Sequence, residues 1–218
     1  MKIVFGLIFF QAKAELERLL NSIHTLVPNS QIIAVDGRNL GYPSNNPLST
    51  DGSRELLEKW GATIIDLPDV MEFEKREAYL REAEKTNAAA VIVVDSDHEL
   101  VGDWKKFEKE LKYIDKSGLY QMPIYTRGID NIWRFNYMSL IVLHPELFHY
   151  EERHDKICIN HIQQNPSGII NGILQINNHD LRTQDRIAKG YIYKVLSRKV
   201  EMNQIPKELL EIMKSIGW

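Results

Sequence analysis

The sequence predicts an α/β fold with a central, mostly parallel sheet, and three observations carry this prediction. Residues 1–100 alternate between short apolar runs and longer segments with helical periodicity. The apolar runs are rich in β-branched residues and short enough to be buried strands. Such an alternation is typical of a parallel sheet covered by helices on both faces. After residue 100 the pattern changes to longer strands, which indicates a mixed or antiparallel part.

The first three elements follow from the start of the chain. Residues 3–10 are an apolar run, which we interpret as the first buried strand. In residues 13–27 apolar side chains recur every three or four positions, as in an amphipathic helix, and Pro28 ends it. Residues 31–35 form the second expected strand, and Asp36 follows it directly.

A loop rich in Gly, Pro and Asn separates the second strand from the next helix. It spans residues 37–49, and loops of this length in compact domains are usually functional or disordered. Residues 49–53 (Ser-Thr-Asp-Gly-Ser) offer helix N-caps, so a short helix is expected over 54–60, ended by Gly61. A third strand at 62–65, a helix at 72–85 and a fourth strand at 91–94 complete this half.

The second half is predicted to be less regular. An amphipathic helix is expected at 103–113, longer strands at 119–125 and 133–143, and a helical turn at 145–148. Weaker strands at 157–159 and 169–176 precede two helices at 181–196 and 206–216, the first with a basic face. The sequence shows no repeats, low-complexity tracts or clean linker. We therefore expect one domain over residues 1–218, made of the halves 1–100 and 101–218.

Composition narrows the function classes. Of the 218 residues, 44% are hydrophobic and 26% charged, as in ordinary globular proteins. The net charge is −3, so no basic field favours nucleic acid as a partner. The single Cys158 cannot form an internal disulfide, which favours a reducing compartment. Because residues 3–10 lack a basic region before them and a charged helix follows at once, a signal peptide is not expected, and we predict a cytoplasmic location.

Carboxylates follow two of the expected strands. Asp36 ends the second strand, and Asp95 and Asp97 follow the fourth. The carboxyl ends of parallel strands meet at the edge of the sheet where ligands bind. Each Asp alone is equally well explained by a solvated turn, but several acids on one rim repel each other without a cation. A divalent cation that carries phosphate oxygens satisfies this arrangement.

Cationic residues and a histidine add to the candidate site. Lys75 and Arg76 begin the helix before the fourth strand; Arg76 suits a phosphate or a base edge, although neighbouring Glu residues are equally consistent with a solvated helix face. His179 lies just past a weak strand, and the following basic helix contributes Arg182. Several chemistries lose their support, because the sequence contains no P-loop, dinucleotide Gly-rich fingerprint, His-Glu-x-x-His zinc motif or Gly-x-Ser-x-Gly elbow.

The pattern resembles a GT-A glycosyltransferase, in particular the inverting family 2, over about residues 2–193. Four pieces match in order: residues 32–36 with 49–57, Lys75-Arg76, Asp95-Ser96-Asp97 as a D-x-D motif, and residues 178–191 as a late H…R…K…Y stretch. The sequence departs from the family after the first strand, where Gln-Ala-Lys replaces the usual acid. It also departs in the long loop 37–49 and in the Arg-Glu pair at 76–77, where the family has Arg-Asn.

The resemblance implies a role for each matched residue. Asp36, Arg76, Asp95 and Arg182 would contact the nucleotide of a nucleotide-diphosphate sugar, with residues 1–100 as the nucleotide-binding half and 101–218 as the acceptor-binding half. Asp97, with Asp95 and His179, would hold Mg²⁺ or Mn²⁺, which neutralises the leaving diphosphate.

An inverting transfer also needs a general base for the acceptor hydroxyl. The resemblance places it in the stretch 151–155, with Asp155 as the first candidate and Glu151 and Glu152 as alternatives; a solvated charged turn explains each of them equally well. Trp133 and Tyr42 are candidates for stacking on a sugar, although most aromatic side chains belong to cores.

The expected function is therefore transfer of a sugar from a UDP- or GDP-sugar to a hydroxyl acceptor, either a glycan or a lipid-linked molecule. The basic face of residues 181–196 also allows peripheral contact with a membrane. Two alternatives stay open. One is a sugar-phosphate nucleotidyltransferase, which should carry a Gly-rich loop after the first strand. The other is a non-catalytic nucleotide-sugar or glycan-binding module of the same fold.

Overall fold

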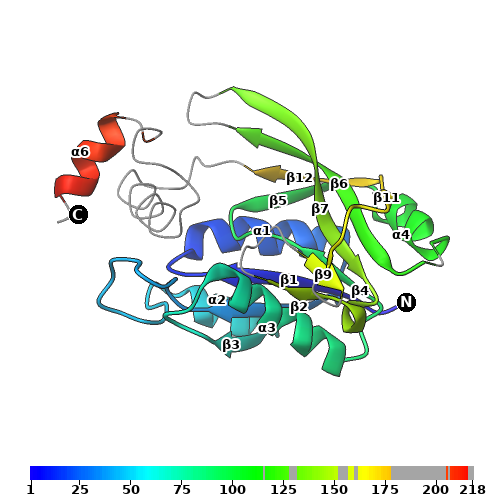
Figure 1. Cartoon of the computed structure of the whole chain (residues 1–218), viewed down its shortest axis with the longest axis horizontal. Helices are drawn as coiled ribbons and strands as arrows, with labels where there is room; N and C mark the ends of the chain where they lie inside the picture. The colour runs from blue at the N-terminus through cyan, green and yellow to red at the C-terminus, as the bar shows by residue number, and fades with distance from the viewer. Residues whose placement is uncertain are drawn as a thin grey trace.

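The first half of the chain forms the expected βαβαβαβ unit (Figure 1). The computed structural model describes residues 1–114, 116–127, 132–151, 157–159, 162–177, 205 and 207–215. The strands of this half are β1 (Ile3–Phe9), β2 (Gln31–Asp36), β3 (Thr63–Asp66) and β4 (Ala90–Val93), and its helices are α1 (Lys13–Leu26), α2 (Ser53–Lys59) and α3 (Glu72–Lys85). The four strands are parallel in the order β3-β2-β1-β4. Connections between parallel strands through a helix are right-handed. The chain moves from β1 to β2 to β3 in one direction across the sheet and then returns to β4 on the other side of β1, so α1 and α2 lie on one face and α3 on the other.

The second half extends this sheet with strands of mixed direction. Its elements are β5 (His98–Gly102), α4 (Trp104–Lys112), β6 (Gly118–Arg127), β7 (Trp133–Leu143), η1 (Pro145–Leu147), β8 (His149–Tyr150), β9 (Ile157–Ile159), β10 (Ile162–Gln163), β11 (Gly168–Ile169), β12 (Ile173–Asn177) and α6 (Lys207–Ser215). Among the described residues the main sheet runs β3-β2-β1-β4-β7-β6-β12-β5, with β11 also beside β6, and β8, β9 and β10 form a small second sheet. The main sheet curls, so that its edge strand β5 returns to α1, where the Leu100 N–H donates to Ser22 Oγ at 3.0 Å.

The predicted α/β class with a mostly parallel mixed sheet is confirmed, and most element boundaries agree within one or two residues. One strand was missed: residues 98–102 form β5, which pairs antiparallel with β12. The strand expected at 169–176 is two strands, β11 and β12, separated at Gly172. The expected side-chain N-cap of α2 is wrong, because Gly52 occupies the cap in the left-handed region at φ 91°. The helix expected at 181–196 lies outside the described residues.

The core lies on both faces of the parallel strands. Most side chains of β1, β2 and β4 are fully buried, together with the inner face of α1 at Leu16, Leu19, Leu20 and Ile23. On the other face α3 approaches β1 closely at Gly6, where a Cβ would lie 2.7 Å from the ring of Tyr79. This glycine lets a large aromatic side chain of α3 lie directly on the sheet. None of the helices in the described ranges is long and apolar enough to cross a membrane.

Candidate active site

The carboxyl ends of β1, β2 and β4 meet at one edge of the sheet, and the predicted site residues of the first half gather there. The register pairs Phe9 with Asp36 and Gly6 with Val93, so the loops after these strands leave the sheet side by side. This edge is the usual ligand site of open α/β sheets. Asp36, Asp95 and Asp97 all follow strands that end at this edge.

Asp36 is completely buried and cross-links two loops. Its carboxylate accepts hydrogen bonds from the backbone N–H of Ser49, at 3.1 Å to Oδ2, and from Ser49 Oγ, at 2.7 Å to Oδ1. Arg54 of α2 donates to Asp36 Oδ2 at 2.7 Å and also to Asp66 at 2.7 Å. Hydrogen bonds to Asp66 and then Asp36 raise the pKa of Arg54. Both oxygens of Asp36 therefore hold the long loop and α2 in place. The predicted contact of Asp36 with a nucleotide would be a further interaction of the same carboxylate.

The loop after β1 is tied to the segment that precedes α2. The Gln11 N–H donates to Ser49 Oγ at 2.9 Å, and Ala12 donates to Ser53 Oγ at 2.9 Å. The Lys13 N–H donates to Asp51 Oδ2 at 3.0 Å. Ser49 and Ser53, which were expected to cap α2, thus bind the backbone before α1, and Asp51 joins both segments because its Oδ1 also accepts from the Ser53 N–H at 3.1 Å.

The long loop 37–49 is held on its other side by the segment before α3. Arg38 forms a two-pronged ion pair with Asp69, with Nε–Oδ1 at 2.6 Å and Nη2–Oδ2 at 3.0 Å. The Lys75 ammonium donates to the carbonyl of Gly37 from a side chain that is 2% exposed. Burial lowers the pKa of Lys75 to about 8 against the opposing charges of Asp36, Glu72 and Asp69. In the sequence alone this buried lysine is indistinguishable from one on a solvated helix face.

Arg76 joins α3 to the end of β4. Its Nη2 donates to Asp95 Oδ1 and to Glu72 Oε1, both at 3.0 Å, while Nη1 lies 3.4 Å from the hydroxyl of Tyr79. Burial lowers the pKa of Arg76, but the charges around it, Asp95 foremost, outweigh burial and raise it well above its usual value. Tyr79 in turn lies 3.2 Å, hydroxyl to hydroxyl, from Tyr150 of β8. The structure thus joins Arg76 and Asp95 in one ion pair, while their roles in nucleotide binding stay predictions.

The D-x-D segment is a tight turn between β4 and β5. The His98 N–H donates to the Asp95 carbonyl at 2.9 Å, and the Asp95 N–H donates to His98 Nδ1 at 3.1 Å. Because Nδ1 accepts, the proton of a neutral His98 ring is on Nε2, which lies 3.8 Å from Asp95 Oδ2. The Asp95 side chain is 39% exposed, whereas Asp97 is 1% exposed and its carbonyl accepts from Arg18 at 3.4 Å.

The carboxylate oxygens of Asp95 and Asp97 are suitable ligands for a divalent cation. Hard cations such as Mg²⁺ and Mn²⁺ prefer carboxylate oxygens. Within the described ranges, however, no group of three His, Cys, Asp or Glu side chains converges on one point. Asp95 and Asp97 therefore need a further ligand, or oxygens of a bound diphosphate, to complete a coordination shell.

The remaining predicted residues come from the second half. Glu151 follows β8, and its carboxylate lies 2.8 Å from His149 Nε2. Because the neighbouring Tyr150 contacts Tyr79, Glu151 lies on the α3 side of the sheet. The residues that lie outside the described part of the chain are Glu152, Asp155, His179 and Arg182.

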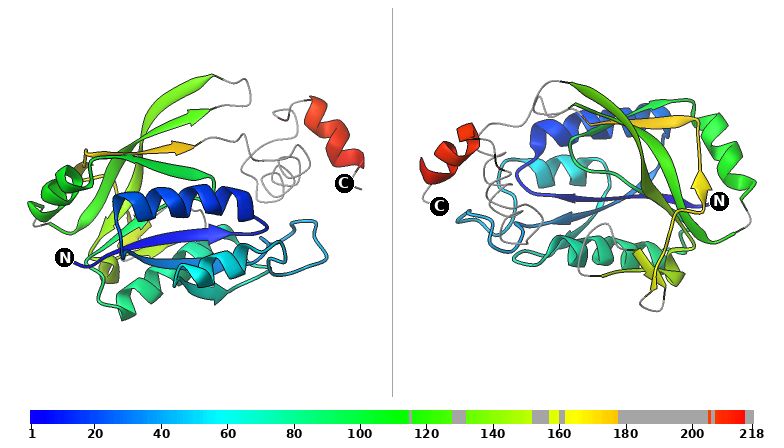
Figure 2. Two further views of the ribbon diagram at one scale, coloured as in Figure 1. Left: turned by 180° about the vertical axis from the view of Figure 1, so that it is seen from behind. Right: turned by 45° about the horizontal axis from the view of Figure 1, so that its top comes forward.

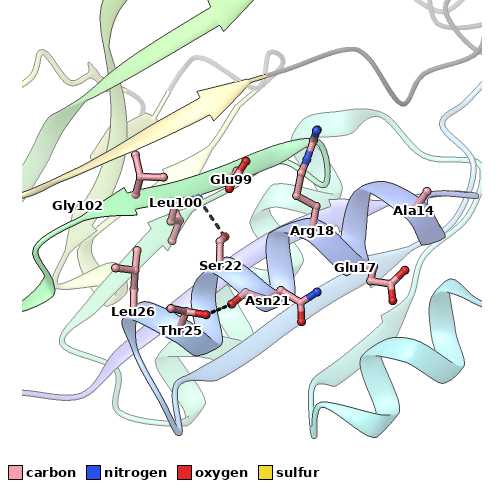
Figure 3. A pocket seen from close by; sticks show the side chains of 11 residues that line it. Ala14, Glu17, Arg18, Asn21, Ser22, Thr25, Leu26, Glu99, Leu100 and Gly102 are labelled. Atoms are coloured by element: carbon pink, nitrogen blue, oxygen red, sulfur yellow. Dashed lines mark hydrogen bonds between the residues drawn. The ribbon is translucent and has the colours of Figure 1, made fainter.

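A separate cavity of about 680 Å³ lies between α1 and the edge strand β5 (Figure 3). It is lined along the helix by residues such as Glu17, Asn21 and Thr25, and along the strand by residues 99–102. None of the three predicted aspartates lines it. Arg18 contributes to this cavity and also contacts the Asp97 carbonyl, so the cavity borders the D-x-D turn from the α1 side.

Comparison with solved structures identifies the fold. The chain matches S. aureus TarS over 99% of its own length and 43% of that chain, with 14% identity and a TM-score of 0.51. The match to the TarS fragment 1–349 covers 99% and 79%, with 12% identity and a TM-score of 0.55. GalNAc-T7 with UDP, GalNAc and Mn²⁺ matches over 99% and 54%, with 11% identity and a TM-score of 0.51. The chain therefore has the GT-A glycosyltransferase fold, as expected.

These matches rest on structure. No protein-family model matches the chain, and no curated protein sequence does either. The chain spans less than half of the longer TarS chain. At identities of 11–14% the structural similarity shows the shared fold alone.

Proposed function

We propose that this protein is a glycosyltransferase that moves a sugar from a nucleotide-diphosphate sugar to a hydroxyl group of an acceptor. The observation that carries the proposal is the ion pair between the buried Arg76 and the half-exposed Asp95 at the carboxyl edge of a GT-A sheet. The similar TarS fragment was crystallised with UDP-GlcNAc, and GalNAc-T7 with UDP and Mn²⁺. These ligands support a UDP-sugar as the first donor to test, with GDP-sugars as the alternative.

In this proposal Arg76 and Asp95 orient the donor. Arg76 fixes one oxygen of Asp95, which leaves Oδ2 on a half-exposed carboxylate to accept from a ribose hydroxyl. The guanidinium stays charged at every physiological pH, so it also adds positive potential beside the diphosphate. Asp36 and Lys75 act one step further away, because they hold the loop 37–49 that would border the base.

Asp95, Asp97 and His179 are the proposed ligands of Mg²⁺ or Mn²⁺. A divalent cation bound there supplies positive charge to the leaving diphosphate. The carboxylate oxygens of the first two residues support this assignment. Arg182 is proposed as a further contact with the diphosphate.

The general base is proposed in the segment after β8. The contacts from Arg76 through Tyr79 to Tyr150 support this proposal, because Tyr150 directly precedes the segment. We propose Asp155 as the base and Glu151 or Glu152 as alternatives, with inversion at the sugar carbon as the outcome. This segment belongs to the proposed acceptor-binding half, residues 101–218.

Thermal shift with donors tests the proposal. UDP-, GDP- and dTDP-sugars are added with and without Mn²⁺, and a ligand that binds the native state raises the melting temperature. Stabilisation by one nucleotide class, larger with Mn²⁺, is expected. No stabilisation by any donor would contradict the proposal.

Turnover then separates an enzyme from a binding module. Donor hydrolysis is measured in the wild type, in Asp97→Asn and in Asp103→Asn as the matched control. Asp103 lies at the opposite end of β5 and caps α4, a role that Asn can also fill. Loss of hydrolysis in Asp97→Asn alone supports the metal role. Donor binding without hydrolysis or transfer in the wild type would indicate a non-catalytic module.

A further inference from the structure

The β6–β7 hairpin carries a row of exposed aromatic side chains. Their exposed fractions are 46% for Trp133, 49% for Phe135, 40% for Tyr125 and 36% for Tyr137. The register places Trp133 opposite Arg127 and Phe135 opposite Tyr125. Ring centroids lie 4.9 Å apart for Tyr125 and Phe135 and 5.1 Å apart for Phe135 and Tyr137. We call these four residues the aromatic ladder.

The aromatic ladder lies on the α3 face of the sheet. Gly6 marks this face, because its Cβ would meet Tyr79 of α3. Val4, two residues before Gly6, shares the face, and register pairs connect it across the sheet in the order Val4–Val91–Val142–Leu119. Side chains alternate along a strand, so Tyr125, six residues after Leu119, returns to this face. Arg76, Tyr79 and the ladder are therefore on the same side of the sheet.

The ladder also begins at the level of the D-x-D turn. The pairing of β4 with β7 ends at Ile92 and Ile141, and Asp95 lies three residues further along β4. Each residue of a strand advances the chain by about 3.3 Å. Counted from the pair of Ile92 and Ile141, Asp95 is therefore about 10 Å further along the chain that leaves β4. Along β7, Tyr137 is about 13 Å and Trp133 about 26 Å from the same pair. Figures 1 and 2 show the hairpin projecting from the body above α1 and past the end of its neighbour β12. The ladder thus continues outward from the candidate donor site.

We propose that the aromatic ladder is the platform on which a glycan acceptor lies. This inference rests on the proposed transferase function and adds the class of acceptor and its binding surface. Exposed aromatic rings stack against the apolar C–H faces of sugar rings, and nearby polar groups bind the hydroxyls. Arg127 supplies such a group on the same face, with its guanidinium 6.0 Å from the centre of the Trp133 ring. Residues 118–127 and 132–143 contain no acidic side chain, so the surface suits a neutral or anionic glycan.

The one-sided distribution of aromatics favours a glycan over a membrane or a second copy of the chain. In residues 122–127 and 132–138 the exposed side chains of the opposite face are Ile132, Arg134, Asn136 and Met138, whereas the aromatic rings of these residues all lie on the ladder face. A hairpin buried in the hydrocarbon of a bilayer would be apolar on both faces, unlike this one with Arg134 and Asn136 on its second face. Contact of the aromatic face alone with a membrane surface is the alternative that vesicle sedimentation separates. The aromatic face is instead the one shared with Arg76, where an acceptor must reach a bound donor.

Binding of defined glycans to matched variants tests the proposal. The probes are cellotetraose, chitotetraose, maltotetraose and mannotetraose, titrated by calorimetry into the protein with and without UDP. We expect at least one probe to bind, and Phe135→Ala to weaken it about tenfold, while Phe135→Tyr keeps the ring and retains binding. Met138→Ala is the control, because it removes an exposed apolar side chain of similar exposure, 43%, from the other face. UDP affinity is expected to be unchanged in all three variants.

Four outcomes would overturn the proposal. Two concern the glycans: no probe binds, or Phe135→Ala and Met138→Ala weaken binding equally. The other two are that the wild type, but not Phe135→Ala, sediments with vesicles of phosphatidylcholine and phosphatidylglycerol, or that it alone self-associates in analytical ultracentrifugation. The last two would assign the surface to a membrane or to a second copy. Failure of the transferase function is distinguishable, because it would abolish donor binding in the wild type while glycan binding is still measured without UDP.

Discussion

At the carboxyl edge of the parallel strands charged side chains are buried and paired, whereas on the β6–β7 hairpin large apolar side chains are exposed. Asp36, Lys75 and Arg76 are at most 6% exposed, yet each has a partner of opposite charge or a carbonyl. Phe135 on the hairpin is 49% exposed. Both arrangements cost folding free energy relative to the usual distribution of residues.

The difference indicates two kinds of preorganisation. Buried, paired charges are rigid and hold loops in one geometry, which suits a small ligand with fixed phosphates. An exposed aromatic row on a projecting hairpin is accessible along its length, which suits an extended ligand. Mutations should therefore affect stability strongly at the edge and weakly on the hairpin.

Arg76→Ala is expected to have the largest effect. It removes a cation that is 7% exposed and leaves Asp95 and Glu72 without it. Because Asp95 is 39% exposed and is partly hydrated when left alone, we expect a loss of unfolding free energy at the lower end of the range for such pairs, about 3 kcal/mol. Arg81→Ala on the same helix is the control; Arg81 is 34% exposed, and its ion pairs with Glu77 and Glu84 are at the surface. Urea unfolding measures both variants, and a loss that is equal in the two would contradict a special role for the buried pair.

Asp36→Asn is expected to cost about 2 kcal/mol, because the amide cannot replace a carboxylate that accepts from Ser49 and Arg54. Asp66 is the other partner of Arg54, and its side chain is 51% exposed. Asp66→Asn should therefore change the unfolding free energy by less than about 0.5 kcal/mol. Chemical unfolding compares the two variants. If Asp66→Asn were the more damaging, Arg54 rather than Asp36 would organise the loop.

Lys75 gives the edge a pH dependence. The pKa of Lys75 is about 8 in the folded protein, below the value of 10.5 for an ordinary lysine in the unfolded chain. Between pH 8 and 10.5 the unfolded chain therefore binds more protons than the folded protein. Stability of the wild type relative to Lys75→Met should therefore rise with pH in this window, by about 1.5 kcal/mol between pH 7.5 and 9.5. Parallel urea titrations of both proteins measure this difference. A flat or falling difference would mean that the ammonium is not buried as described.

The fold was largely predictable because strand and helix periods in the first half are regular. The missed strand β5 has a clear physical reason: His98 and Leu100 are buried, whereas Glu99 and Val101 are half-buried, but the acidic residues before it masked this short alternation. The helix cap was wrong because Ser49 and Ser53 bind the loop after β1, a contact between segments about 40 residues apart. Such partners depend on tertiary packing.

The candidate site was predictable in its residue types and only partly in its contacts. The pairing of Arg76 with Asp95 follows from their places at the start of α3 and the end of β4. Lys75 was a candidate only through its position beside Arg76, and Arg54 gave no signal, because a Lys among glutamates and an Arg at the start of a helix usually face solvent. The metal and base assignments to Asp97, His179 and Asp155 stay predictions.

The smallest effect on stability is expected from the hairpin. Phe135→Ala removes a side chain that is half-exposed and touches only Tyr125 and Tyr137 among the rings of the ladder, so it should cost about 0.5 kcal/mol or less. Ile141→Ala, six residues along the same strand, removes a fully buried side chain and should cost about 3 kcal/mol. Thermal and urea unfolding compare the pair. A large loss in Phe135→Ala would mean that the ladder stabilises the fold, and an exposed row that is stabilising in itself would no longer need a ligand to explain it.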